Sequence, residues 1–319
     1  MELIIPGALP PHSVAEETAA HVGKNATLLR RLFEYGIPHI HLADPDQTGC
    51  TPYEAWLVQH YQFAPSPGQA PCAALAPILA PDAAAETPLW LFQLAHFGLS
   101  NSGAHMLTAD DIAVTEQESL ALYKNAVDIF TDTPFALTGH TPAGWTVAVP
   151  DGLRLPSCSP ALIASADLAH VWPQEDAFKP LRRLLSELQI AWHHHPVNEA
   201  RRDRQMPLIN GGWLFGGAAP VQLAAPAAAM PIVIRDLEAA HRQRQWGHWL
   251  ALLPTVEQTL ARELAAALKP QSRGNPVARP VSLTLTGDDR WVTLTLKPAP
   301  ALFKWLPAKR KQWKQWWSQ

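Results

Sequence analysis

Residues 193–217, HHHPVNEARRDRQMPLINGGWLFGG, combine three histidines, three arginines, two asparagines and four glycines in one connection. The stretch 178–192 before it predicts a helix, because its apolar residues recur on one face: Leu181, Leu184, Leu185, Leu188 and Trp192. The apolar run 209–215 is interrupted by glycines and is typical of a core strand. Helix, polar loop and strand in this order indicate an α/β protein that presents polar groups to a small anionic ligand.

The N-terminal residues predict a β-α-β-α order. Residues 2–5 form a short apolar run that Pro6-Gly7 ends, which predicts a first strand. Ser13 with Glu16 matches a capping box and predicts one helix that runs towards Tyr35. Gly36 fits the position after that helix where the left-handed conformation is common. Residues 37–43 alternate like a strand.

Later signals extend this pattern along the chain. Thr51 with Glu54, and Thr115 with Glu118, predict two further capped helices. Residues 281–286 and 291–296 alternate with period two around Gly-Asp-Asp-Arg, which predicts a hairpin. The expected fold is α/β, a mixed sheet flanked by helices with an α+β insert. We expect these parts: 1–64, the β-α-β-α part of the core; 65–88, a Pro/Ala-rich linker; 89–217, an α+β region; 218–300, helices and hairpin completing the core; 301–319, a basic Trp-rich tail.

The composition is that of a globular protein, with 319 residues, 47% hydrophobic and 17% charged. A net charge of −3 makes nucleic acid an unlikely partner. The N-terminus lacks the features of a signal peptide, and the apolar run 218–234 contains Gln222 and three prolines, so no membrane span is expected. The three cysteines are far apart in the sequence and form no CxxC pair, which favours a reducing, cytoplasmic location.

The polar segment 193–217 holds the candidate site. Adjacent side chains diverge, so the histidine triplet is a poor chelator, and we expect no metal ligands and no cofactor there. Arg201 and Arg202 can hold phosphate or carboxylate, and Asn198 and Asn210 can donate amide hydrogens. The alternative is a solvated basic turn whose partners are the neighbouring acids of the segment.

The last sixteen residues offer a second possible partner site. Four tryptophans are interspersed there with five basic residues, a mix that suits an anionic membrane surface or single-stranded nucleic acid. Docking of the tryptophans on the parent domain, with a solvated basic face, is the favoured interpretation.

The motif HPVN-x-x-R, followed by P-x-x-N and a strand ending in glycines, resembles archaeal-type 2,3-bisphosphoglycerate-independent phosphoglycerate mutases of the alkaline-phosphatase superfamily. The whole chain resembles proteobacterial phosphoglycerate mutase-like proteins, the RpfE-type regulatory group. This resemblance implies an alkaline-phosphatase-like core. It also implies a site lined by His195, Asn198, Arg201 and Asn210, and Arg202 of the basic run completes the expected substrate-binding set.

Two departures from the mutase pattern bear on activity. The chain begins IIPGALPP, where the family has an aspartate-glycine turn, and no Asp-His pair follows Gly217. We therefore expect a degenerate core and a catalytically degenerate relative of regulatory type that binds a small phosphorylated or carboxylated metabolite. The alternatives are an active mutase or phosphatase that uses Mn or Mg, and a scaffold protein whose C-terminal tail binds a protein partner.

Overall fold

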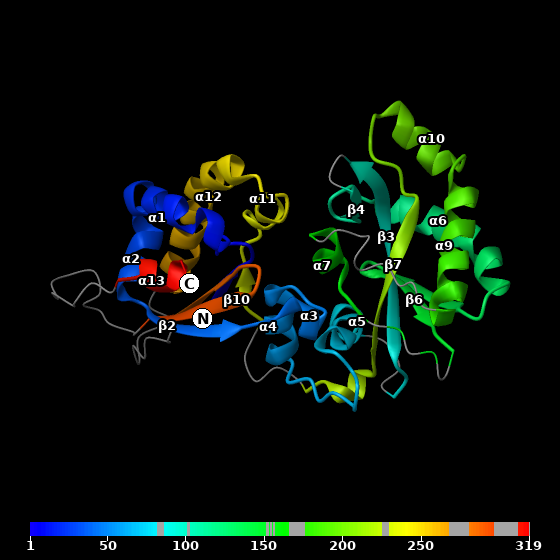
Figure 1. The fold of residues 1–319 in the computed structure, drawn as a ribbon, viewed down its shortest axis with the longest axis horizontal. Helices are drawn as coiled ribbons and strands as arrows, with labels where there is room; N and C mark the ends of the chain where they lie inside the picture. Colours follow the sequence, from blue (N-terminus) through cyan, green and yellow to red (C-terminus); the bar gives the residue numbers. More distant parts are fainter. Residues whose placement is uncertain are drawn as a thin grey trace. The chain divides into compact units, whose positions relative to one another are not determined.

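The computed structural model describes residues 1–81, 86–100, 103–150, 153, 155, 157–165, 176–224, 230–267, 281–296 and 312–318. The chain divides into two compact units (Figure 1). The first unit combines Met1–Pro45 with Ala227–Gln319, and the second is Asp46–Pro226. Each unit has its own sheet with flanking helices, so the predicted mixed α/β class is confirmed.

The sheet of the first unit has the order β2-β10-β9-β1-β8. β1 runs parallel to β8 and β9, whereas β10 runs antiparallel to β9 and β2, so this sheet is mixed. The predicted hairpin is confirmed as β9 and β10. The strands span Glu2–Ile5 (β1), Ile37–Leu42 (β2), Ile232–Val233 (β8), Val281–Thr286 (β9) and Arg290–Leu296 (β10).

Helices from both ends of the chain cover one face of this sheet (Figure 1). Their bounds are His12–Asn25 (α1), Thr27–Tyr35 (α2), Glu238–Arg242 (α11), Trp246–Ala267 (α12) and Lys314–Trp317 (α13). Leu3 and Ile5 of β1 pack with Val292 of β10 and with apolar residues of α1, α2 and α12 in one core. Burial of this shared apolar surface holds the N- and C-terminal segments together.

Three details of the first helical region differ from the sequence prediction. α1 begins after Pro11, which makes no side-chain cap bond, so the predicted Ser13 capping box is wrong. The helical region is also interrupted at Ala26, where φ is −108° and ψ is 81°. Gly36 has a φ of −64° and not the predicted left-handed conformation. A Cβ on Gly36 would lie 2.8 Å from the Leu32 carbonyl oxygen, so close packing accounts for this glycine.

The described part of the C-terminal tail packs into the first core. Trp313, Trp316 and Trp317 are buried, and the ring of Phe33 lies 5.3–5.4 Å from each of their rings. The indole N–H of Trp317 donates to the Ala15 carbonyl at 3.2 Å. Docking of these three tryptophans is therefore confirmed, while residues 301–311 lie outside the described part of the chain.

The sheet of the second unit is built around the long strand β3, Leu89–Ser100. β3 pairs with β4, β6 and β7, and β5 pairs with β6, all antiparallel. The remaining strands span Gly103–Thr108 (β4), Ala136–Thr141 (β5), Gly144–Ala148 (β6) and Gly211–Ala218 (β7). An antiparallel sheet with flanking helices therefore forms this unit.

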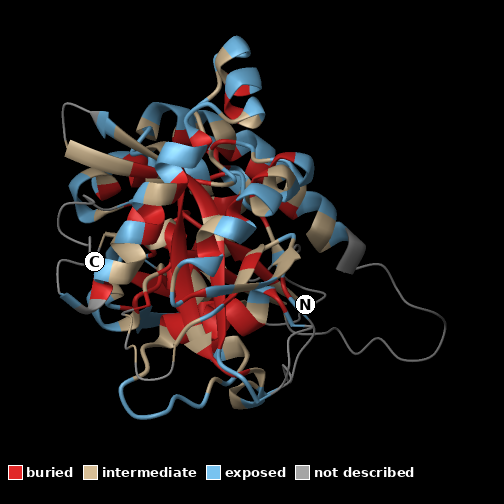
Figure 2. Cartoon of the chain, turned by 90° about the vertical axis from the view of Figure 1, so that its right-hand side faces the viewer, coloured by how far each residue is buried: buried red, intermediate tan, exposed pale blue. Residues whose placement is uncertain are grey.

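Two helices form the main core of this unit with the sheet. Glu116–Thr131 (α6) and Lys179–Trp192 (α9) pack apolar faces against Trp90, Phe92 and Leu94 of β3. In Figure 2 the centre of the sheet is mainly red, and β7 in particular is almost wholly buried, whereas the helices alternate red with pale blue, as amphipathic helices do. The other helical segments are Pro45–Thr48 (α3), Pro52–His60 (α4), Pro71–Ala74 (η1), Leu75–Leu79 (α5), Pro160–Ala164 (α7), Asp176–Phe178 (η2), Pro196–Asp203 (α10) and Pro220–Gln222 (η3).

Both later capping boxes are confirmed. Thr51 accepts from the Glu54 N–H at the start of α4, and Thr115 accepts from the Glu118 N–H at the start of α6. Part of the stretch expected as a linker, 65–88, forms η1 and α5, and both contain buried residues. No helix in the described part of the chain is both long enough and apolar enough to cross a membrane.

Candidate functional site

The candidate segment forms a short helix between α9 and β7. α9 ends at Trp192, and α10 begins at Pro196, where a missing N–H costs nothing. His195 is the N-cap, and its Nδ1 accepts from the Val197 N–H at 3.2 Å. Asn198 and Arg201 face the interior, three residues apart on the helix, and both are buried.

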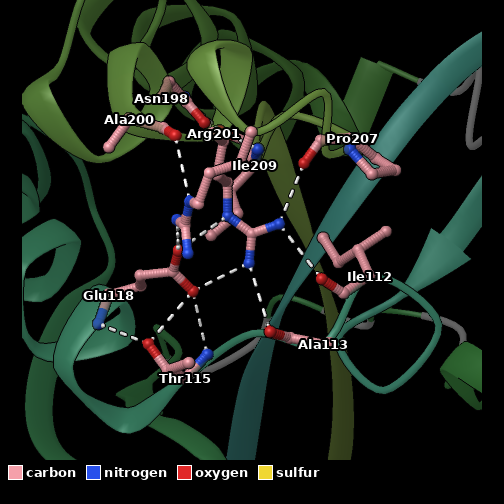
Figure 3. A network of polar contacts seen from close by, with 10 residues as sticks. Ile112, Ala113, Thr115, Glu118, Asn198, Ala200, Arg201, Pro207 and Ile209 are labelled. Carbon is pink, nitrogen blue, oxygen red and sulfur yellow. Dashed lines mark hydrogen bonds and ion pairs between the residues drawn. The ribbon is translucent and has the colours of Figure 1, made fainter.

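Arg201 is the centre of a buried polar network (Figure 3). Its side chain is 0% exposed. Nε and Nη2 donate to the two Glu118 carboxylate oxygens at 3.0 and 2.8 Å. Nη1 donates to the carbonyls of Ile112 and Pro207 at 3.0 and 2.9 Å, and Nη2 also reaches the Ala113 carbonyl at 3.4 Å. A guanidinium has five N–H donors, so every donor of Arg201 has an acceptor within the protein.

Glu118 is equally well satisfied. One oxygen accepts from Arg201 and from Arg204, and the other accepts from Arg201 and from the N–H and hydroxyl of Thr115. Burial alone would raise the pKa of Glu118. The hydrogen bonds from Arg201 and Thr115 and the charge of Arg201 outweigh burial and lower the pKa to about 2. The carboxylate is therefore charged at neutral pH and forms a buried bidentate ion pair with Arg201.

The two asparagines of the segment bind the main chain. The Asn198 amide donates to the carbonyls of Trp192 and Ile209, both at 2.8 Å, and its oxygen accepts from the Ile209 N–H at 2.9 Å. The Asn210 side chain accepts from the Phe97 N–H at 2.7 Å and donates to the Phe97 carbonyl at 2.8 Å. Asn198 thus joins the end of α9 to the chain before β7, and Asn210 joins that chain to β3.

His195 and Arg202 lie at the surface of α10. His195 is half-buried, and burial lowers the pKa of its imidazole. Because its Nδ1 accepts a hydrogen bond, the neutral ring carries its proton on Nε2. Arg202 donates to the Glu199 carboxylate and to the His193 carbonyl, and a third of its side chain is exposed. The five predicted residues therefore serve different partners, and the predicted role of the set in ligand binding stays a prediction.

Glu118 is the residue of this network that sequence reasoning missed. Its position in the capping box explained its presence without a second partner. The pair Arg201 and Arg202 could have pointed to it. Adjacent residues lie about 100° apart on a helix, so the two arginines cannot both face solvent equally. A buried arginine needs an acid, and Glu118 is 83 residues away in sequence.

Metal-binding side chains do not gather in the described ranges: no group of three or more His, Cys, Asp or Glu is placed there to hold an ion. His241 approaches Asp288 at 3.7 Å, a pair that the sequence spacing did not predict. His241 donates from Nε2 to the Leu9 carbonyl at 2.9 Å, and Asp288 forms an ion pair with Arg244 at 2.6 Å. Both side chains thus have structural partners in the first unit.

The three cysteines are free thiols that the fold brings near one another. Cys50 and Cys72 are buried, and the Ser157 hydroxyl donates to the Cys72 sulfur at 3.2 Å. Burial raises the pKa of Cys50 well above its ordinary value and that of Cys158 to about 11. Because their pKa values are raised, the Cys50 and Cys158 thiols are protonated and weakly nucleophilic at neutral pH.

Comparison with known proteins gives structural similarities, among them two at low sequence identity. No protein-family model matches the chain, and no curated protein matches it significantly. A protein from Pyrococcus horikoshii is 12% identical with a TM-score of 0.47, over 98% of this chain and 91% of the other. A cofactor-independent phosphoglycerate mutase from Thermoplasma acidophilum is 13% identical with a TM-score of 0.32, over 98% of this chain and 94% of the other.

Proposed function

We propose that this chain is a phosphoglycerate mutase-like binding protein that does not transfer phosphoryl groups and that binds a small phosphorylated or carboxylated metabolite. The observation that carries the proposal is the saturation of Arg201. All five of its N–H donors have acceptors inside the protein. Arg201 is the charged residue of the HPVN-x-x-R motif, which the mutase resemblance would place at a phosphoryl group.

Saturation of Arg201 argues against a catalytic role for it. Phosphoryl transfer depends on donors that face the charge on the transferring group. To face a substrate, Arg201 would have to leave Glu118, whose carboxylate is buried and charged. Separation of a buried ion pair costs about 3–5 kcal/mol, because one charge is left without compensation. A substrate contact would have to exceed that cost before it contributed to binding.

The surface of α10 holds the polar side chains that remain for a ligand. His195 uses Nδ1 to cap the helix, so its Nε2–H is left to donate to a ligand. Arg202 is partly exposed, and surface partners such as Glu199 contribute about 0–1 kcal/mol, so exchange with a ligand anion is cheap. We therefore propose His195 and Arg202 as the ligand contacts. Asn198, Arg201 and Asn210 would hold α10 and residues 208–210 in place.

Calorimetric titration of the full chain with 3-phosphoglycerate and with a small dicarboxylate tests this assignment. Arg202→Gln should weaken binding about tenfold or more, because a charge-assisted contact is lost. Arg183→Gln is the matched control: Arg183 is an exposed α9 arginine that also bonds a nearby glutamate, Glu187, at 2.7 Å. Absence of binding at millimolar ligand, or equal loss in both variants, would contradict the assignment.

An assay of mutase and phosphatase activity separately tests the proposal that the chain does not transfer phosphoryl groups. The protein, supplied with Mn²⁺ or Mg²⁺ and 3-phosphoglycerate, should give neither 2-phosphoglycerate nor free phosphate above the uncatalysed rate. Metal-stimulated turnover that copurifies with the chain and is lost in a site variant would establish the active-enzyme alternative instead.

A further inference from the structure

A second pair of polar side chains lies on the β3–β4 hairpin, outside the α10 segment. In the antiparallel register Gly98 faces His105, and His96 faces Leu107. Residues that face one another across antiparallel strands point to the same side of the sheet, as do residues two apart on one strand. His96 and His105 therefore share one face as a diagonal pair, with their ring centroids 6.5 Å apart.

Gly98 leaves a space between the two imidazoles. A Cβ at Gly98 would lie 2.9 Å from His105 Nε2 and 3.2 Å from His96 Nε2. Both nitrogens border the same point, so they are at most about 6 Å apart. Any other residue at position 98 would occupy the space that separates them.

His96 has a fixed tautomer. Its Nδ1 lies 2.8 Å from the Leu208 carbonyl, which can only accept, so Nδ1 carries the proton and Nε2 has a free lone pair. Asn210 binds both main-chain polar groups of the next residue, Phe97, and so fixes residues 208–210 against this strand. An imidazole that donates its second N–H to a backbone carbonyl has the arrangement usual for a metal ligand.

His105 is the adjustable partner. Its Nδ1 is buried and makes no hydrogen bond to the described residues. Because no bond fixes the ring, rotation about its side-chain torsions can bring a nitrogen towards His96. Two nitrogens at about 2.0–2.1 Å from a tetrahedral ion are about 3.3 Å apart, which requires a side-chain movement but no movement of the strands.

We propose that His96 and His105 form a two-histidine site for a divalent transition-metal ion such as Zn²⁺ or Cu²⁺. Imidazole nitrogen suits these ions, whereas Mg²⁺ and Ca²⁺ prefer oxygen. Two protein ligands leave the other coordination positions to water or to a small anion, so the site is open. This site is independent of the proposed α10 contacts.

Titration of the chelator-washed full chain with Zn²⁺, followed by calorimetry, tests the site. We expect one ion per chain, and His105→Gln and His96→Gln should each weaken its binding by about tenfold or more. Gly98→Ala keeps both imidazoles but fills the space between them, so it should weaken binding as well. Far-ultraviolet circular dichroism checks that each variant is folded.

The control is the exposed neighbouring pair His193 and His194, whose rings lie 4.5 Å apart. The double variant His193→Gln/His194→Gln should bind Zn²⁺ as the unchanged protein does. The electron paramagnetic resonance spectrum of the Cu²⁺ complex should show coupling to two imidazole nitrogens. No binding below millimolar Zn²⁺, unchanged affinity in His105→Gln, or loss in the 193/194 variant would overturn the proposal.

Discussion

The α10 segment and the β3–β4 hairpin use polar residues in opposite ways. In the α10 segment, the buried Asn198 and Arg201 have protein partners for their donors. In the hairpin, His105 has none among the described residues, and His96 keeps one nitrogen free. The segment richest in polar residues is therefore mainly structural, whereas an inconspicuous hairpin holds the unused nitrogen atoms. Density of polar residues in a sequence measures the need for hydrogen bonds as much as the capacity to bind a ligand.

The largest expected effect is that of Arg201→Met. Removal of one partner from a buried ion pair should lower the free energy of unfolding by about 3–5 kcal/mol, because the charge of Glu118 stays behind. Urea denaturation followed by fluorescence measures the change. Arg202→Met, on the exposed side of the same helix, should cost less than about 1 kcal/mol. Similar losses in the two variants would remove the contrast between interior and surface.

The pH dependence of stability sharpens the same contrast. The folded-state pKa of Glu118 is about 2, against an ordinary value of 4.5. Because the folded value is the lower one, this stabilisation is present above about pH 5 and is lost as the pH falls towards 2. The contribution of the Glu118 carboxylate to the free energy of unfolding should be on the order of 3 kcal/mol. The difference in unfolding free energy between the unchanged protein and Glu118→Gln should therefore shrink in acid, and a constant difference would refute this reading.

Asn210 connects the two regions, because it binds Phe97 next to His96. Asn210→Ala removes both bonds and should lower the unfolding free energy by about 1–3 kcal/mol. Hydrogen exchange at the Phe97 amide should become faster, since that amide loses its acceptor. Unchanged protection of this amide would show that the asparagine does not hold the strand.

The smallest effect is expected in the hairpin. His105→Leu removes a buried nitrogen that has no partner, so the unfolding free energy should change by less than about 1 kcal/mol or rise. His96→Leu breaks the bond to the Leu208 carbonyl and should cost about 1 kcal/mol. Thermal denaturation of metal-free protein compares the two. A larger loss in His105→Leu than in His96→Leu would reverse the predicted order.

Local signals predicted much of the fold. The capping boxes at Thr51 and Thr115, the apolar face of 178–192 and the C-terminal hairpin all depend on residues within one helix or one turn. Gly36 was predicted for the wrong reason. A Cβ there would lie 2.8 Å from the Leu32 carbonyl oxygen and 3.0 Å from the Leu294 Cβ, and Leu294 is 258 positions away, outside any local pattern.

The candidate site was predictable only in part. The helix before the segment and the strand at its end were correctly expected as α9 and β7, with Pro196 beyond the end of α9. The connection between them was expected as a polar loop, and residues 196–203 instead form the helix α10. The partners were not predictable, because Glu118 and Phe97 come from distant parts of the chain. The hairpin histidines escaped notice because their pairing depends on the register of β3 with β4.

The central claim is that the Arg201 guanidinium belongs to the interior and does not contact a ligand. The ¹⁵N NMR signal of its Nε–H group, assigned by its absence in Arg201→Lys, measures this directly. We predict slow exchange of that hydrogen with solvent and no displacement of the signal when 3-phosphoglycerate is added. Rapid exchange, or a shift that follows 3-phosphoglycerate concentration to saturation, would contradict the claim.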